Sequence, residues 1–380
     1  METLTYVAPG VKGRRSVTLT PDPLPRVVEA RLGTVAEAVD PDARAVLLGD
    51  ESVVYFDRLI LAPGARPAHL PPGSIADGAV PFVQYFEGVT DFRALQESLG
   101  SAKEIAVVGG GRLGTELAAS LAGEGDTPRS VSLLSRSGLP MSKWWPPYLA
   151  GAAAAELGRV GVTVRPDTEV VDIAATDDGL AASLSLSPPD STPLRADRVV
   201  LAVGSRPNID LGRAAGLEVD EANGGIAASS ELQTSRSHIF AAGDGASVFE
   251  PILGRRRIQH EQDAVASGEA AAKAALGDRT PFHRLPRASG RIGRLAYSAV
   301  GKIDASLPTV GIFDETAPPA ERLHRGIVYY FDEKKNSVAG VLLVGVRGRE
   351  GEAAKLVESE RPYYDKTGLA PRFISIEDAE

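Results

Sequence analysis

The sequence feature that most limits the possible folds is a glycine-rich turn at residues 109–114, which joins an apolar run to an alanine-rich run. Residues 104–108 (EIAVV) have the length and composition of a short buried strand, and residues 112–118 (RLGTELA) those of the first turns of a helix. Glycines occur in the spacing G-x-G-x-x-G at Gly109, Gly111 and Gly114. We expect Gly109 to allow a sharp turn, Gly111 a close approach of a ligand to the backbone, and Gly114 tight packing of the helix on the strand.

The start of this helix predicts what the turn binds. The first N–H groups of a helix lack partners within it and lie at the positive end of its dipole, which suits a diphosphate. Because the motif has a strand before it and a helix after it, it predicts dinucleotide binding rather than a purely structural turn. The predicted contacts are Gly109, Gly110, Gly111, Arg112, Leu113 and Gly114.

Composition excludes several other classes of function. At 380 residues the chain can form two or three domains with separate cores. It has no cysteine, which excludes disulfides, thiolate metal sites and a redox-active dithiol. Its five histidines are scattered, so we predict no metal site. The net charge of −9 gives no general attraction to nucleic acid or to an anionic membrane.

The sequence also bears on cellular location. No apolar run approaches the roughly 20 residues that span a bilayer, so we predict no transmembrane segment. Residues 1–16 resemble neither a signal peptide nor a transit peptide. If Met1 is the true start, these observations predict a cytoplasmic protein.

Short apolar runs between turn signals predict the secondary structure of the rest of the chain. Runs at 27–30, 34–39, 45–48 and 53–56 suggest a small antiparallel meander, and residues 169–200 suggest a second one. Helices are predicted at 89–99, 147–159, 260–276 and 352–358. Strands are predicted at 130–134, 163–165, 307–313, 326–331 and 338–344.

Two distant segments share one pattern. Residues 57–67 and 197–208 each have a polar start, an apolar strand, a glycine and an Arg-Pro pair. Two such strand ends indicate two similar nucleotide-binding halves, and strands that alternate with helices indicate parallel sheets. The predicted fold class is therefore α/β, with two Rossmann-like nucleotide-binding domains, the first incomplete, and an α+β C-terminal domain. Near the end of the second pattern, Gly204 is a candidate for cofactor contact.

A further strand delivers an acidic residue to the ligand side of a parallel sheet. Residues 234–244 contain an apolar run that ends at Gly243-Asp244. Because ligands bind at the carboxyl ends of such strands, we expect Gly243 and Asp244 to contact a cofactor. The alternative is that Asp244 only caps the next turn.

In combination, these motifs resemble the two-dinucleotide-binding-domain flavoproteins, the FAD/NAD(P)-dependent pyridine nucleotide oxidoreductases. Within that family, residues 231–233, 253–260, 306–313 and 326–331 are most similar to the apoptosis-inducing factors. The likeness extends from about Arg26 to about Tyr364. It implies an incomplete FAD-type domain at 1–85 and 210–280, an NAD(P)-binding Rossmann domain at 86–209, and a C-terminal α+β dimerisation or interface domain at 281–380.

The resemblance implies an enzyme, a flavin-dependent NAD(P)H oxidoreductase with FAD and NAD(P)H as cofactors. Nicotinamide would stack on the flavin ring and pass a hydride to it. Glu116 and His260 would be the catalytic residues, both close to the flavin, and Asp244 would hydrogen-bond the ribityl chain. Family members are also associated with mitochondria, with homodimers and with cell death. Without the resemblance, Glu116 is an ordinary acid in a first helical turn and His260 the first residue of a helix. Trp144 and Trp145 are expected to be packing residues.

Two departures from the family affect the cofactors. No G-x-G-x-x-G motif precedes Gly109, although the family opens with one for FAD. Either upstream residues are missing from this sequence or FAD is not bound in the usual way. The alternative function is therefore a flavin-less NAD(P)H-binding, dimer-forming sensor or interaction protein. The second departure is Arg136, which stands where an NAD-binding protein has an acid and suits the 2′-phosphate of NADPH. The alternative is a solvated surface arginine.

The third departure is a basic stretch. Residues 279–302 contain many arginines and no acid, and they replace aromatic residues that the family has near Ala288. Such a stretch could bind nucleic acid. We favour a solvated loop, or a patch that faces acids of the same protein.

Overall fold

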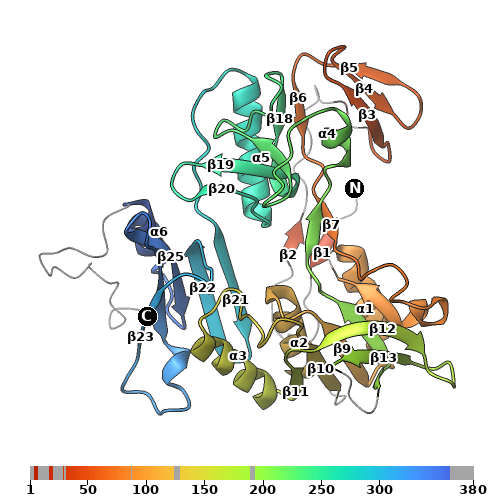
Figure 1. Ribbon diagram of the computed structural model, residues 1–380, viewed down its shortest axis with the longest axis vertical. Helices are drawn as coiled ribbons and strands as arrows, with labels where there is room; N and C mark the ends of the chain where they lie inside the picture. Colours follow the sequence, from red (N-terminus) through yellow and green to blue (C-terminus); the bar gives the residue numbers. More distant parts are fainter. Residues whose placement is uncertain are drawn as a thin grey trace, which may run out of the picture. The chain divides into compact units, whose positions relative to one another are not determined.

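The computed structural model describes residues 29, 31–86, 88–123, 129–188 and 193–359, and the backbone of residues 4–6 and 17–19 (Figure 1). The chain forms two compact units. Unit 1 comprises residues 1–19, 67–204 and 288–380, and unit 2 comprises residues 20–66 and 205–287. Of the predicted strand at 27–30, only Glu29 lies within the described residues. The predicted three-domain boundaries stay a prediction.

Unit 1 contains a five-stranded parallel sheet in the order β11-β10-β9-β15-β8. These strands are β11 (Val162–Arg165), β10 (Ser130–Leu134), β9 (Glu104–Val108), β15 (Arg198–Leu201) and β8 (Val83–Tyr85). The helices of this part are η1 (Asp77–Phe82), α1 (Val89–Ser98), α2 (Arg112–Gly123) and α3 (Pro147–Arg159). Val107, Val131 and Val200 are fully buried, because strands covered on both faces by other elements are apolar on both faces. This is the predicted Rossmann sheet.

The predicted second meander is a three-stranded antiparallel sheet in the same unit. It consists of β12 (Glu169–Ala175), β13 (Ala182–Ser187) and β14 (Leu194–Ala196). Alternate residues of β13, Ala182, Leu184 and Leu186, are buried, as expected for a sheet with one covered face. Two further short strands, β1 (Leu4–Tyr6) and β2 (Val17–Leu19), pair with each other.

The C-terminal part of unit 1 is a five-stranded antiparallel sheet in the order β21-β22-β25-β24-β23. Its strands are β21 (Arg287–Ile292), β22 (Leu295–Gly301), β23 (Thr309–Phe313), β24 (Gly326–Asp332) and β25 (Ser337–Val344). Helix α6 (Glu350–Glu358) packs on β25 and β22, and η3 (Arg322–His324) precedes β24. The α+β character of this part is as predicted.

One prediction about this part is wrong. The basic stretch 279–302 is not a solvated loop from residue 287 onward, because residues 287–301 form the hairpin of β21 and β22. Leu295, Tyr297 and Ala299 of β22 are buried. Three of the arginines in the stretch face acids of their own unit, as the alternative interpretation expects: Arg279 pairs with Glu231, Arg284 with Asp263, and Arg294 with Glu156.

Unit 2 begins with the first predicted meander, β3 (Ala36–Asp40), β4 (Ala45–Leu48) and β5 (Val53–Tyr55). Strand β6 (Leu59–Leu61) pairs in parallel with β18 (Ile239–Ala241). A three-stranded sheet contains β17 (Ile226–Ala228), β19 (Ala246–Glu250) and β20 (Gly254–Arg256). The helices are α4 (Asp210–Ala214), η2 (Gly243–Gly245) and α5 (Glu261–Ala275).

The repeated Arg-Pro pattern has a structural explanation. Its two ends form β7 (Ala65–Pro67) and β16 (Ser205–Pro207), which pair with each other. The chain leaves unit 2 at the first of these strands and returns to it at the second. Arg66 donates from Nη1 to Asn208 Oδ1 (2.9 Å) and to Asp210 Oδ2 (3.0 Å).

A buried carboxylate joins the Rossmann part of unit 1 to its C-terminal sheet. Glu156 of α3 is only 4% exposed. Its Oε1 accepts from Arg294 Nη2 and its Oε2 from the Arg294 backbone N–H, both at 3.0 Å. Arg159 Nε also donates to Oε2 (3.0 Å). Burial by itself would raise the pKa of Glu156, but the hydrogen bonds from Arg294 and Arg159 outweigh it and lower the pKa to about 2.

We expect Glu156→Gln to lower the free energy of unfolding by roughly 1–3 kcal/mol at pH 7, because two arginines lose a charged partner. The stabilisation by Glu156 is present above its unfolded pKa near 4.5 and is lost as the pH falls toward about 2. The difference between variant and wild type should therefore shrink over that window in urea titrations. Glu352→Gln is the control, because Glu352 is half-exposed and its ion pair is with Arg349, at the start of its own helix. A loss that is equally large at both ends of the window would contradict the assignment.

Candidate functional site

The carboxyl ends of β9, β10 and β15 meet around the glycine turn. Gly109 has φ +125°, and a Cβ there would lie 2.2 Å from the carbonyl oxygen of Ala202, which follows β15. A Cβ on Gly110 would lie 2.2 Å from Ser135 Oγ, which follows β10. A Cβ on Gly114 would lie 2.0 Å from the Gly109 carbonyl oxygen. Glycine is therefore required at all three positions for the turn and the helix to pack as they do.

The remaining glycine of the motif is in a different environment. A Cβ on Gly111 would contact only the ring of Trp144, at 3.4 Å, so the backbone here is open to a ligand. The first turn of α2, which is fully described, contains no acidic residue, and Leu113 within it is 43% exposed. Free N–H groups, a positive dipole end and an open glycine fit the diphosphate of a dinucleotide. The structural roles predicted for Gly109 and Gly114 are confirmed, and the ligand contacts stay a prediction.

One turn into α2, Glu116 contacts the C-terminal sheet of unit 1. Tyr297 Oη on β22 donates a hydrogen bond of 2.5 Å to Glu116 Oε1. Gly290 on β21 makes room for this carboxyl group, since a Cβ there would lie 1.8 Å from Oε1. Burial raises the pKa of Glu116, and the Tyr297 hydroxyl and the charge of Arg112 only partly oppose it. Glu116 can therefore hold a proton at a higher pH than an exposed glutamate.

Tyr297 is itself held in place. It is 6% exposed, and the ring of Trp145 packs against it edge-on with the centroids 5.0 Å apart. Trp145 is 1% exposed, which confirms its predicted packing role, whereas Trp144 is 36% exposed and its ring lies next to Gly111. Sequence analysis missed Tyr297 and Gly290, although the alternation of Leu295, Tyr297 and Ala299 was a signal for a strand with one buried face.

Arg136 follows β10, next to the glycine turn. Its side chain is 71% exposed, and Nη1 lies 3.5 Å from Glu169 Oε1. The preceding residue, Ser135, is buried against Gly110. The arginine can therefore reach a phosphate by giving up only an exposed and weak ion pair. Gly204, at the end of β15, has φ +103° and no atom within 4 Å of a Cβ position, so this turn is open as well.

The other predicted cofactor residues lie in unit 2. Gly243 (φ +68°) and Asp244 form the short helix η2 directly after β18, as predicted for a strand end. Burial raises the pKa of Asp244, and the charges of Arg257 and His260 oppose it. No hydrogen bond reaches the Asp244 carboxylate from the described residues. An unused, half-buried acceptor at a strand end fits a ligand hydroxyl such as that of a flavin ribityl chain.

His260 is the N-cap of α5, where its Nδ1 accepts from the Gln262 backbone N–H at 3.3 Å. Its other near neighbour is Asp263, with Oδ2 3.9 Å from Nδ1. His260 is thus an N-terminal residue of a helix, as the alternative interpretation expected. Its catalytic role stays a prediction. Arg257 donates to the Asp244 carbonyl oxygen, and its charge acts on the Asp244 carboxylate. The sequence did not predict Arg257 as a site residue.

Two other features bear on the type of site. Within the described residues, no three His, Asp or Glu side chains are grouped as metal ligands. No described helix is both long and apolar enough to cross a bilayer.

Comparison with known proteins identifies the family. Residues 3–268 match the model of the family described as pyridine nucleotide-disulphide oxidoreductase. The chain belongs to this family. The predicted resemblance to the pyridine nucleotide oxidoreductases is thereby confirmed. The family description agrees with the predicted oxidoreductase class and with the predicted cofactors, FAD and NAD(P)H. The sequence has no cysteine, so a dithiol within these 380 residues takes no part in its chemistry.

Two curated relatives are named as apoptosis-inducing factors. A putative mitochondrial apoptosis-inducing factor 1 of Drosophila melanogaster is 27% identical, covering 90% of this chain and 52% of the relative. Mitochondrial apoptosis-inducing factor 1 of Dictyostelium discoideum is 29% identical, covering 86% and 62%. The chain thus spans between half and two thirds of the length of these relatives.

Solved structures show the same fold. The covalent putidaredoxin reductase–putidaredoxin complex aligns with a TM-score of 0.77 at 24% identity, covering 91% of this chain and 79% of that one. An engineered water-forming NADPH oxidase bound to NADPH, derived from the NADH oxidase of Lactobacillus brevis, aligns with a TM-score of 0.75 at 20% identity, covering 90% and 77%. The predicted α/β fold class with Rossmann-like domains is therefore confirmed.

The contact between Tyr297 and Glu116 makes a prediction about pH. Because the pKa of Glu116 is raised in the folded state, its contribution to stability is largest below its unfolded pKa near 4.5 and is lost as the pH rises through the folded pKa. In Tyr297→Phe the hydroxyl that stabilises the charged carboxylate is absent, so only the charge of Arg112 opposes the effect of burial. The pKa of Glu116 should therefore rise further. We expect this variant to lose roughly 1–2 kcal/mol of unfolding free energy at pH 7.5, and less at pH 4.5.

Urea titrations of wild type, Tyr297→Phe, Glu116→Gln and the double variant would measure this effect. In the Glu116→Gln background, which has no titrating carboxyl group at this position, the loss caused by Tyr297→Phe should not change with pH. A loss that depends equally on pH in both backgrounds would show that Tyr297 acts through another group.

Proposed function

We propose that this chain is an FAD-dependent NAD(P)H oxidoreductase of the apoptosis-inducing factor type. The observation that carries the proposal is the glycine turn of unit 1, where Gly109, Gly110 and Gly114 admit no side chain and Gly111 leaves the backbone open. A bound flavin supplies the redox chemistry, by accepting a hydride from reduced nicotinamide.

Unit 1 holds the nicotinamide nucleotide in this proposal. The N–H groups at the start of α2 bind its diphosphate. The exposed side chain of Leu113 packs against the nucleotide. Glu116 is the acid nearest this turn along α2, and the Tyr297 hydroxyl fixes the position of one of its oxygens. Its other oxygen, Oε2, is then the one that can hold a proton, since burial raises the pKa of Glu116.

Unit 2 holds the flavin. Asp244 accepts from a ribityl hydroxyl with its unused carboxylate, and Arg257 places positive charge beside it. His260 keeps its ring at the start of α5 through the bond from Gln262.

NADPH is the proposed reductant. Arg136 is exposed and free to exchange its weak partner Glu169 for a 2′-phosphate, and Ser135 and Ser137 flank it. In the engineered NADPH oxidase, an acid is replaced by alanine and the next two residues by arginine and serine. The order of small residue, Arg and Ser is the same in Ser135-Arg136-Ser137.

The proposal extends to location and assembly. Both apoptosis-inducing factor relatives are named as mitochondrial, and we propose a mitochondrial location and a homodimer for this protein by the same resemblance. Light scattering before and after reduction by NADPH would detect the dimer, and a mass that stays at one chain in both states would reject it.

The flavin can be tested by spectroscopy. We expect the protein produced with excess FAD to be yellow and to lose its flavin absorbance on anaerobic addition of NADPH. Asp244→Ala should weaken FAD binding by about 10-fold or more, because it removes a charged acceptor. Asp57→Ala, an exposed position of the same unit, is the matched control. A folded, colourless protein that still binds NADPH would instead support the flavin-less binding protein.

The nucleotide preference can be tested by calorimetry. We expect Arg136→Asp to weaken NADPH binding by about 10-fold or more and to leave NADH binding unchanged or stronger. Arg93→Asp makes the same change of charge at an exposed position of α1 and should affect neither nucleotide. Equal losses for NADPH and NADH would remove Arg136 from the 2′-phosphate site.

A further inference from the structure

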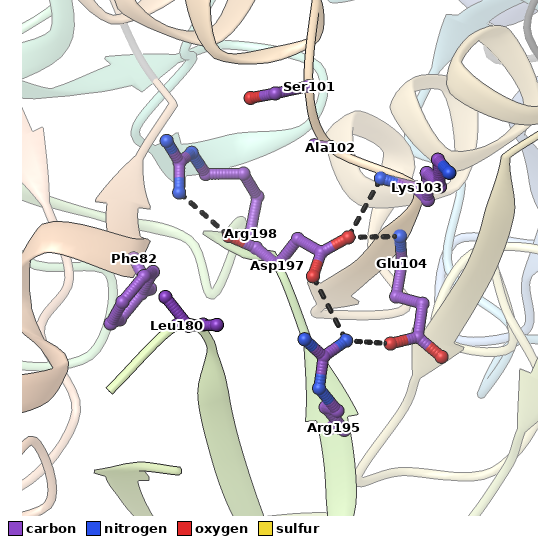
Figure 2. A pocket seen from close by; sticks show the side chains of 9 residues that line it. All are labelled: Phe82, Ser101, Ala102, Lys103, Glu104, Leu180, Arg195, Asp197 and Arg198. Atoms are coloured by element: carbon purple, nitrogen blue, oxygen red, sulfur yellow. Dashed lines mark hydrogen bonds and ion pairs between the residues drawn. The ribbon is translucent and has the colours of Figure 1, made fainter. Parts of the chain in front are cut away.

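A cleft lies at the opposite end of the parallel sheet from the glycine turn. It has a volume of about 660 Å³ and is lined by residues at the amino ends of β9 and β15, by Phe82 of η1 and by Leu180 (Figure 2). Strand β9 is five residues long, which separates the cleft from Gly109 by roughly 15 Å. The volume is within the range of small-molecule sites, and the position excludes overlap with the predicted diphosphate contacts.

The charges in the cleft do not cancel. Lys103, Arg195 and Arg198 carry three positive charges, and Glu104 and Asp197 carry two negative ones, which leaves a net charge of +1.

The two acids are already engaged. Asp197 Oδ2 accepts from the backbone N–H groups of Lys103 (2.8 Å) and Glu104 (2.9 Å). Arg195 Nη1 donates to Asp197 Oδ1 (3.0 Å) and also to Glu104. Asp197 therefore holds the strand starts together, and both acids pair with Arg195 (Figure 2). The charges of Lys103 and Arg198 are not paired with these acids.

Arg198 is held in place but has hydrogen-bond donors that are not used. Its Nη1 donates to the Asp197 carbonyl oxygen (2.8 Å), and its guanidinium lies over the Phe82 ring, 6.0 Å from the centroid. Its other N–H groups have no partner in the described part of the chain. A guanidinium that is held by a hydrogen bond beside an aromatic ring and keeps other donors can bind a planar anion. Within the described residues, Ser101 Oγ makes only one long hydrogen bond, of 3.5 Å to Ser98 O, so it is a further donor in the cleft.

The cleft also has an apolar wall. Leu180, in the turn between β12 and β13, is 70% exposed, and Phe82 is partly exposed. A large apolar side chain that is so exposed at the rim of a cleft gains by contact with an apolar ligand group.

We propose that this cleft binds a small organic carboxylate, with the carboxylate on Arg198 and the apolar body against Phe82 and Leu180. One net positive charge matches a monoanion, and the free guanidinium donors match the two oxygens of a carboxylate. It shares no residue with the proposed nucleotide and flavin sites.

Calorimetry with benzoate as the probe tests this proposal. We expect saturable binding with a dissociation constant on the order of 1 mM, and a loss of about 10-fold or more in Arg198→Gln. Leu180→Ser should weaken binding by about 3-fold or more, because it removes apolar contact at an exposed position where folding is not at risk. Arg93→Gln, on α1 of the same unit, should bind benzoate as wild type does.

Three ligand comparisons complete the test. Benzamide, which has the same shape without the charge, should not bind measurably, and inorganic phosphate should bind more weakly than benzoate. NADPH at saturation should not displace benzoate. The assignment is overturned if benzoate does not saturate the wild type, if Leu180→Ser and Arg198→Gln bind it unchanged, if benzamide or phosphate binds as tightly, or if NADPH competes.

Discussion

The close packing at the carboxyl ends of β9, β10 and β15 is the constraint on which the rest of unit 1 depends. At Gly109 and Gly110 the turn passes within van der Waals distance of Ala202 and Ser135, and at Gly114 the helix touches the turn itself. These contacts leave no volume for a Cβ, so the start of α2 can lie at the edge of the sheet only with this glycine spacing. The same packing brings the free N–H groups of α2, the exposed Arg136 and the open Gly204 turn to one edge of one sheet.

The C-terminal sheet then contacts α2 and α3 through two acids, the partly buried Glu116 and the buried Glu156, whose pKa values shift in opposite directions. Glu156 accepts four hydrogen bonds from Arg294 and Arg159, which stabilise its charge more than burial opposes it. Glu116 has a neutral hydroxyl as its hydrogen-bond partner and only the more distant charge of Arg112, so burial prevails and its pKa rises. Glu156 therefore serves to hold the sheet, while Glu116 can change its protonation state. The predicted catalytic acid is the one whose environment leaves it able to titrate.

Much of this fold could be predicted because its patterns are local. The limits of β4, β10 and α3 are those expected from the sequence, since apolar runs, turn residues and an alanine-rich period occur within a few residues of each other. The glycine turn was predictable for the same reason. The hairpin of β21 and β22 was missed because its arginines and glycines resemble a solvated loop, and the acid that neutralises Arg294 lies 138 residues away in the sequence. Tyr297 was missed for a similar reason, because Glu116 is 181 residues away from it.

The two ends of β9 and β15 show how one pair of strands supports two kinds of chemistry. At the carboxyl ends the backbones approach so closely that side chains are excluded, and binding there relies on N–H groups and glycine. At the amino ends Asp197 instead accepts the backbone N–H groups of Lys103 and Glu104, so a side chain holds the strand starts in register. Because the carboxylates of Asp197 and Glu104 also accept from Arg195, the charges of Lys103 and Arg198 stay available. The carboxylate that fixes the sheet at one end is thus the reason that the cleft there attracts anions rather than cations.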